Sequence, residues 1–170
     1  MSLLGAVLAA LAVYALQFLR FSMNTRVRTV EDLERATGLP VLASFPRIGA
    51  GSRRLPLETA SYLRTAIAIA TANVQPKILL VTSANAADGK SSVAIALATS
   101  FARQRSRTLL LDLDLRRPVL GSEFGLSRYG TPRTSDALEG QHDVFPTAVS
   151  ASSVQFDVLP SFSAAPDASE

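Results

Sequence analysis

The sequence contains no cysteine and only one histidine among its 170 residues. Without cysteine the chain forms neither disulfide bonds nor thiolate metal sites. His142, the single histidine, has no partner for a metal site or a catalytic triad, so we expect an ordinary surface residue. Lysine is also scarce: only Lys77 and Lys90 occur, and the basic character comes from arginine. Because no aromatic residues are interleaved with these charges, we expect no nucleic-acid partner.

Long hydrophobic runs, by contrast, are present, and hydrophobic residues make up 48% of the chain. The run from Leu3 to Leu19, LLGAVLAALAVYALQFL, carries no charge. As a helix it reaches roughly 25 Å, near the lower limit for crossing a bilayer core. We therefore predict that residues 1–20 form a transmembrane helix. A buried core helix is the alternative. A cleaved signal peptide is a further alternative, but it needs positive charge before the run, and here the arginines follow it.

The arginines that follow this run predict its orientation. Arg20, Arg26 and Arg28 lie on its C-terminal side, and positive charge is retained on the cytoplasmic side of a membrane. We expect a single-pass protein of the inner membrane whose C-terminal part is cytoplasmic.

Residues 21–56 are predicted to form a juxtamembrane connector and a basic linker. The segment TVEDLERATGLP predicts a short helix that Thr29 caps and that Gly38 ends. The segment RIGAGSRRLP, residues 47–56, is typical of a flexible linker. Its arginines either contact anionic lipid headgroups or are simply solvated.

Residues 57–170 alternate between helical and strand patterns, which predicts an α/β domain. Apolar residues recur at helical spacing in 57–73, and the alanine-rich stretch 91–104 predicts a second helix. The apolar runs ILLVTS (78–83) and TLLLDLD (108–114) predict buried parallel strands joined by one crossover unit. FDVLP adds a third strand and SDALEG a short helix. The fold class is a P-loop NTPase-like parallel sheet, here incomplete, with the transmembrane helix before it.

The loop SANAADGKSS between the first strand and the second helix has the features of a phosphate-binding loop. Backbone N–H groups and the helix dipole favour anions at a helix N-terminus. A lysine reaches the outer phosphates, and a Ser hydroxyl binds Mg²⁺. Lys90 and Ser91 supply these two groups; the alternative is a lysine in an ordinary strand-to-helix turn. The predicted nucleotide-binding residues are Asn85, Ala86, Ala87, Asp88, Gly89, Lys90, Ser91 and Ser92.

Two carboxylates end the predicted strand 108–114. Asp112 and Asp114 lie two residues apart and therefore share one side of the strand. Ligands of open α/β sheets bind beyond the carboxyl ends of the strands, so we expect both carboxylates to face the phosphate loop. Solvated acids at a strand end are the alternative.

Together the segments SANAADGKSS and LLLDLDLRRP resemble the bacterial protein-tyrosine kinases of capsule and exopolysaccharide synthesis, over nearly the whole chain. The family's loop reads Thr-Ser-x-x-Pro-Gly-Glu-Gly-Lys-Ser, and its second motif is a hydrophobic run followed by Asp-x-Asp-x-Arg. The second motif is matched in full by residues 109–116. The first is matched at Thr82, Ser83, Gly89, Lys90 and Ser91, with Asp88 for glutamate, Ala86 for proline and Ala87 for glycine.

The resemblance implies ATP and Mg²⁺ as cofactors. It implies catalytic roles for Lys90, Asp112 and Asp114, with Ser91 and Asp112 as metal ligands. It implies partners at the inner membrane, either further copies of the chain or the machinery that exports and polymerises polysaccharide. The family's subunit-bridging helix motif is kept at Glu58 and Arg64 but has Ser61 in place of its middle arginine.

The family's third acidic motif and its C-terminal tyrosine cluster have no counterpart in the sequence. We therefore expect a middle portion of such a kinase, without kinase turnover of its own. Two other functions stay open. One is a non-catalytic, membrane-anchored regulator of polysaccharide chain length. The other is a partition-type P-loop ATPase, although Asn85 stands where those enzymes carry a signature lysine.

Overall fold

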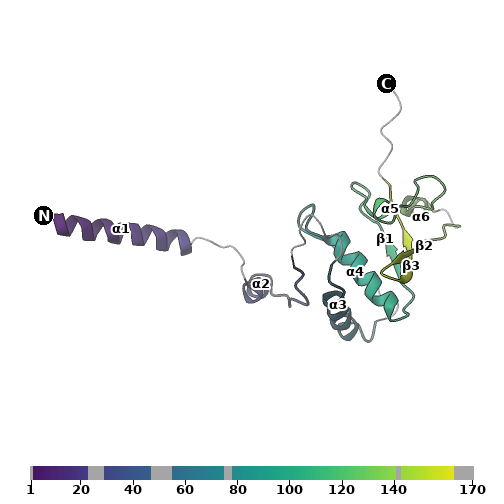
Figure 1. Cartoon of the computed structure of the whole chain (residues 1–170), viewed down its shortest axis with the longest axis horizontal. Coiled ribbons are helices and arrows are strands. Elements are labelled where there is room, and N and C mark those ends of the chain that lie inside the picture. The colour runs from purple at the N-terminus through teal and green to yellow at the C-terminus, as the bar shows by residue number, and fades with distance from the viewer. Residues whose placement is uncertain (1, 23–28, 47–54, 75–77, 141–142, 163–170) are drawn as a thin grey trace, which may run out of the picture. The chain divides into compact units, whose positions relative to one another are not determined.

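The computed structural model describes residues 2–22, 29–46, 55–74, 78–140 and 143–162. The chain divides into two compact units, Met1–Val41 and Leu42–Glu170. Figure 1 shows the elements of both units in chain order.

The first unit contains two helices, α1 (Ser2–Ser22) and α2 (Val30–Thr37). The predicted cap of α2 is confirmed, because the Thr29 hydroxyl accepts a hydrogen bond from the backbone N–H of Asp32 at 3.2 Å. Gly38 ends the helix in the left-handed conformation, with φ of 68°. That conformation suits glycine, which has no Cβ to clash.

The helix predicted for residues 1–20 is present as α1, but its assignment as a transmembrane span is not supported. A span needs about 20 consecutive apolar residues. Among the residues that the structure describes, no helix has the length and apolar character to cross a membrane. Arg26, Arg28 and residues 47–54 of the predicted linker lie outside the described residues.

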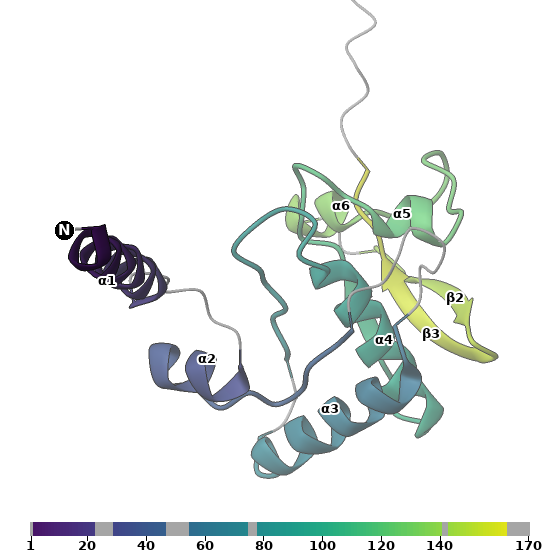
Figure 2. The same ribbon diagram turned by 60° about the vertical axis from the view of Figure 1, so that its left-hand side comes forward.

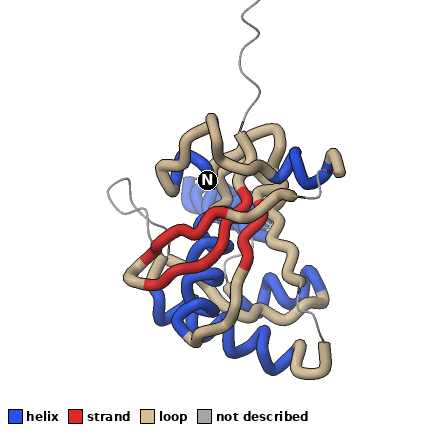
Figure 3. The backbone as a smooth tube through the Cα atoms, turned by 90° about the vertical axis from the view of Figure 1, so that its right-hand side faces the viewer, coloured by secondary structure: helices blue, strands red, loops and turns tan. Residues whose placement is uncertain are grey.

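The second unit carries a three-stranded sheet in the order β1-β3-β2 (Figure 3, red). β1 pairs with β3 in parallel, whereas β2 pairs with β3 in antiparallel orientation. The prediction of a parallel sheet is therefore confirmed for β1 and β3, whereas the antiparallel β2 makes the sheet mixed. The elements are α3 (Leu57–Ala70), α4 (Lys90–Arg103), β1 (Leu109–Leu111), α5 (Leu120–Glu123), α6 (Thr134–Leu138), β2 (Thr147–Ala151) and β3 (Val154–Leu159).

Helix α4 lies between α3 and the sheet (Figure 2). Small side chains let α3 approach it closely: Ala60 is fully buried, and the Ser100 hydroxyl donates to that of Ser61 at 3.3 Å. Ser61 therefore contributes to the packing of α3 on α4. The other side of α4 covers a core in which Phe124 and Phe156 meet edge to face at 5.8 Å. The buried members of this core are Ala98, Leu120, Val149, Ala151, Phe156 and Val158.

The prediction of a strand at residues 78–83 is wrong, because this segment belongs to no sheet. Ile78 and Leu80 are 86% and 81% exposed. A strand is stable only when a neighbouring strand pairs with its backbone groups. An apolar run in the sequence indicates burial, but it does not show whether a neighbouring strand is present to pair with it.

Strands β2 and β3 form a hairpin that the sequence did not predict. Its two loop residues, Ser152 and Ser153, have φ of 49° and 68°. Positive φ at both central residues defines the type I′ turn, whose twist matches that of the strands. The usual sequence signal for this turn is Asn-Gly or Asp-Gly, and two serines do not give that signal.

The hairpin turn predicts a stabilising substitution. Ser153→Gly removes the Cβ from a left-handed position, so we expect the free energy of unfolding to rise by about 1 kcal/mol. Urea denaturation followed by circular dichroism measures the change. Ser150→Gly, at an exposed position within β2, is the control and lowers stability because glycine is unfavourable inside a strand. Equal destabilisation by both substitutions would contradict the turn geometry.

Candidate phosphate-binding site

The loop before α4 is held by hydrogen bonds within itself. The backbone N–H of Asn85 donates to Oδ2 of Asp88 at 2.8 Å. The Ser83 hydroxyl donates to the carbonyl oxygen of Asn85 at 2.9 Å. The loop therefore forms a compact turn, with Asn85, Ala86 and Asp88 exposed on its outer side.

The N-terminus of α4 follows this turn directly. Gly89 precedes the helix in the left-handed conformation, with φ of 93°, and no side chain caps the helix at this end. The first N–H groups of a helix have no partner within the helix, and the helix dipole makes this end positive. The N–H groups of Lys90, Ser91 and Ser92 are thus suited to an anion.

A large cavity opens at this helix end. Its volume is about 1120 Å³, ample for a nucleotide-sized ligand. One end is formed by Ala87, Gly89, Lys90, Ser91 and Ser92 of the loop and the first turn of α4. The cavity then runs along α4 between Ile95, Phe124 and Val149. Five of the predicted nucleotide-binding residues therefore share one cavity.

Ala87 is the strained residue of the loop. Its φ is 66°, which costs a residue with a Cβ roughly 1 kcal/mol. The related kinase motif has glycine at this position. A positive φ at this position gives a physical reason for that glycine, and Ala87 adopts it here under strain.

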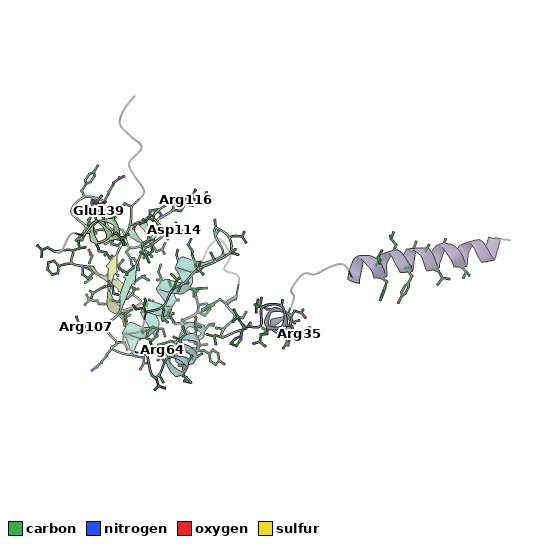
Figure 4. All side chains as sticks on the ribbon, turned by 180° about the vertical axis from the view of Figure 1, so that it is seen from behind. Arg35, Arg64, Arg107, Asp114, Arg116 and Glu139 are labelled. Atoms are coloured by element: carbon green, nitrogen blue, oxygen red, sulfur yellow. The ribbon has the colours of Figure 1, made fainter. Side chains whose placement is uncertain are left out.

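Lys90 and Asp114 form an ion pair beside the cavity. Nζ of Lys90 lies 2.8 Å from Oδ2 of Asp114. The hydrogen bond from Lys90, reinforced by the N–H of Arg117, lowers the pKa of the Asp114 carboxyl below its usual value. Asp114 is therefore ionised at neutral pH. Figure 4 shows Asp114 beside Arg116, and both residues follow β1 in the chain. Both partners are about one-third exposed, so solvent screens the pair.

Asp112 has a different environment, although it lies only two residues earlier. It is 5% exposed. Its Oδ2 accepts hydrogen bonds from the N–H groups of Val119 and Leu120, each at 3.1 Å. Its Oδ1 accepts from the N–H of Asp114 at 3.2 Å. The carboxylate thus holds the start of α5 and the backbone of Asp114.

Further hydrogen bonds fix the backbone around Asp112. The Ser161 hydroxyl donates to its carbonyl oxygen at 2.8 Å, and its own N–H donates to the carbonyl oxygen of Leu159 at 3.0 Å. The buried Thr134 hydroxyl also donates to the Leu159 oxygen, at 2.8 Å. Sequence patterns did not reveal these partners, because they lie far from Asp112 along the chain.

The structure brings the predicted catalytic residues together only in part. Lys90 and Asp114 are in contact, and Asp112 touches the backbone of Asp114. Among the described residues, no hydrogen bond joins Ser91 to Asp112, the predicted metal pair, and both carboxylate oxygens of Asp112 accept backbone hydrogen bonds. Within the described parts of the chain, no group of three or more acidic, histidine or cysteine side chains is placed to hold a metal ion.

The chain is similar in sequence to bacterial tyrosine-protein kinases. It is 42% identical over 64 residues to the tyrosine-protein kinase YwqD of Bacillus subtilis, a match that covers 38% of this chain and 27% of YwqD. It is 30% identical over 162 residues to the putative tyrosine-protein kinase EpsB of Ralstonia nicotianae, covering 83% of this chain and 21% of EpsB. No protein-family model matches the chain.

The fold is also similar to that of a solved kinase domain. The kinase domain of the Escherichia coli tyrosine kinase ETK superposes with a TM-score of 0.66 at 24% identity, over 84% of this chain and 63% of that domain. The family resemblance stated from the sequence is thus confirmed. The chain is related to a part of these kinases, and it spans about a quarter of the length of the curated relatives that it matches.

The environment of Asp112 predicts a structural effect that needs no ligand. Asp112→Ala leaves the buried N–H of Leu120 without its acceptor, so we expect the free energy of unfolding to fall by about 2 kcal/mol. Urea denaturation in metal-free buffer measures the loss, and amide hydrogen exchange at Val119 and Leu120 reports its location. Asp114→Asn, which alters the more exposed carboxylate, is the control and has a smaller effect. Unchanged stability and unchanged exchange in Asp112→Ala would refute the capping role.

Proposed function

We propose that this relative of a part of the bacterial tyrosine-protein kinases binds ATP through its phosphates, at the loop 83–89 and the first turn of α4. The observation that carries the proposal is the position of Lys90, which lies at an uncapped helix N-terminus and is paired with Asp114 at 2.8 Å. A cavity of about 1120 Å³ opens at the same point. Similarity to tyrosine-protein kinases supports ATP as the nucleotide.

Each residue of the site has a distinct role in this proposal. The N–H groups of Lys90, Ser91 and Ser92 hold phosphate oxygens, as helix N-termini do in other anion sites. The Lys90 ammonium leaves Asp114 and neutralises the outer phosphates. Mg²⁺, when bound, neutralises charge on the phosphates. The Ser91 hydroxyl would supply one oxygen ligand to the ion.

In this proposal Asp112 positions Asp114 and, through Asp114, Lys90. Its carboxylate fixes the N–H of Asp114 at 3.2 Å, and the Asp114 carboxylate in turn contacts Lys90. The chain from β1 to α5 therefore keeps Asp114 close to the phosphate loop.

The biological setting is likewise a proposal. From its similarity to these kinases, we infer that the chain acts as part of a tyrosine autokinase of capsule or exopolysaccharide synthesis. Such a kinase transfers phosphoryl groups from ATP to tyrosine. A non-catalytic regulator of polysaccharide chain length is the second candidate. The hydrogen bonds that occupy both oxygens of Asp112 favour it, because they compete with metal coordination by that residue.

Calorimetric titration with ATP and Mg²⁺ tests the phosphate site. We expect Lys90→Ala to reduce ATP affinity by at least tenfold, because the lysine supplies the charge that faces the outer phosphates. Asp114→Asn is the matched variant: it releases Lys90 from its partner, so its ATP affinity equals or exceeds that of the wild type. Unaltered affinity in Lys90→Ala would show that the loop is not a phosphate site.

The Ala87→Gly variant is tested in the same calorimetric titration with ATP and Mg²⁺. Glycine adopts φ of 66° without strain, so the loop is held in its binding geometry at lower cost. We expect affinity to rise by a few-fold to about tenfold, the equivalent of about 1 kcal/mol. A loss of affinity in this variant would mean that the bound loop needs negative φ at this residue.

We also propose that α1 holds the chain at the inner membrane. Large apolar side chains are exposed on this helix: Val7, Leu11 and Phe18 have exposed fractions of 51%, 59% and 62%. Such side chains are stabilised when an apolar phase covers them. The arginines that follow in the sequence favour an anionic surface on the same side.

Flotation with vesicles of phosphatidylethanolamine and phosphatidylglycerol tests this location. The full chain floats with the vesicles, and the double substitution Leu11→Asp and Phe18→Asp leaves it in the lower fraction, because each charge is costly in the acyl region. Leu33→Asp, in α2, is the control and does not prevent flotation. If the unsubstituted chain stays in the lower fraction while the vesicles float, the proposal is disproved.

A further inference from the structure

The cavity at the start of α4 has two parts of different chemistry. The first is the phosphate end, formed by the loop and Lys90. The second is apolar, and it is walled by residues that belong to the hydrophobic core or pack against it. These are Ile95, Phe124, Leu126, Val149 and Ala151. Because the core itself forms this wall, an apolar group placed here is shielded from water as a core side chain is.

The wall that α4 contributes to the apolar part offers little to a polar ligand. Beyond its first turn, α4 lines the cavity with Ile95, Ala96 and Thr99. The Thr99 hydroxyl donates to the carbonyl oxygen of Ile95 at 2.8 Å, so this donor is already engaged within the helix. A nucleotide base placed against this wall gives up hydrogen bonds with water without replacing them there, which costs free energy. An aliphatic chain has no polar groups to satisfy.

The charges on the cavity wall indicate which end holds an anion. Among the described residues that line the cavity, the charged ones are Lys90, Glu58 and Glu123. Lys90 lies at the phosphate end, where the helix dipole also favours an anion. Glu58, in the first turn of α3, and Glu123, the last residue of α5, are exposed carboxylates that repel an anion. A ligand with one anionic head and an apolar body is therefore oriented with its head at Lys90.

We propose that this cavity binds a phosphate ester of an apolar chain, with the phosphate at Lys90 and the chain against Ile95, Phe124 and Val149. The inference rests on the proposed phosphate site, and it makes such an ester a competitor of ATP for that site. The cavity volume of about 1120 Å³ lies above the usual range for small-molecule pockets, roughly 300–1,000 Å³. An alkyl chain of about eight carbon atoms therefore has room beside the phosphate.

Calorimetric titration of the full chain with n-alkyl phosphates tests the proposal, because butyl, hexyl and octyl phosphate share one head and differ only in chain length. Each methylene that leaves water raises affinity by up to about fourfold. We expect octyl phosphate to bind at least about tenfold more tightly than butyl phosphate and to displace ATP. Lys90→Ala weakens the binding of all three esters by about tenfold. Glycerol phosphate, whose chain is polar, is the matched control ligand and binds no more tightly than butyl phosphate.

Two substitutions in the wall separate the chain from the phosphate. Ala96→Leu fills space in the apolar part, so we expect the gain in affinity from butyl to octyl phosphate to fall below about threefold, with ATP affinity unchanged. Leu126→Ser makes another part of the wall polar and reduces the same gain. If circular dichroism shows that one of these variants is unfolded, the other carries the test. Ala137→Leu, at an exposed position of α6 outside the cavity, is the control and keeps the full gain.

Vesicles distinguish two sources of such an ester. Phosphatidic acid presents a phosphate monoester on a lipid, whereas phosphatidylglycerol presents a phosphodiester at a similar surface. Displacement of ATP by phosphatidic acid vesicles, but not by phosphatidylglycerol vesicles, identifies a membrane lipid as the ligand. Displacement by octyl phosphate, but by neither kind of vesicle, identifies a soluble ester.

Three results would overturn the proposal and leave the ATP site standing. The first is binding of ATP with octyl phosphate no tighter than butyl phosphate. The second is an affinity for octyl phosphate that Lys90→Ala does not alter, because the chain would then bind elsewhere. The third is a loss of ATP affinity in Ala96→Leu, because the base would then occupy the apolar part. If neither ATP nor any of the esters binds, the proposed phosphate site is itself refuted, and this inference fails with it.

Discussion

The carboxylate of Asp112 is the interaction on which the second unit depends. It is buried, and it accepts hydrogen bonds from three backbone N–H groups, those of Asp114, Val119 and Leu120. A buried carboxylate is tolerated only when such donors replace water. Because the donors come from the strand exit and from α5, the interaction joins the sheet to the short helix that covers its core. The same residue determines where Asp114 lies, and Asp114 in turn holds Lys90 at 2.8 Å.

This arrangement connects the sheet to the candidate phosphate site through a short series of contacts. In the proposed site, an anion at the first turn of α4 competes with Asp114 for the Lys90 ammonium, so binding weakens the ion pair. The lowered pKa of Asp114 has the hydrogen bond from Lys90 as its main cause. Loss of that bond to a bound phosphate therefore returns the pKa of the carboxyl toward its usual value. In the proposed site, the charges of Lys90 and Asp114 therefore change with the ligand, while the buried carboxylate of Asp112 keeps the backbone in place.

Local patterns in the sequence predicted the elements that local chemistry determines. Helix α2 begins and ends where Thr29 and Gly38 required, and α3, α4 and α6 occupy their predicted segments. The errors within the sheet concern which segments pair as strands. Residues 78–83 have a strand composition but no strand partner, and the hairpin of β2 and β3 turns through two serines that give no turn signal. For the site, the loop and Lys90 were predictable from the motif, whereas the separate environments of Asp112 and Asp114 depend on α5, which no pattern indicated.

The hairpin of β2 and β3 also has a consequence for the order of folding. Its strands are adjacent in the chain, so their pairing closes only a two-residue loop, and hairpins of this kind form within about 1–10 μs. Strand β1 must instead bring Leu110 beside Val158, across α5, α6 and the hairpin itself. Closing a long loop costs more chain entropy and slows folding. During synthesis on the ribosome, β1 emerges before either strand of the hairpin, yet it waits for β3 before it can pair.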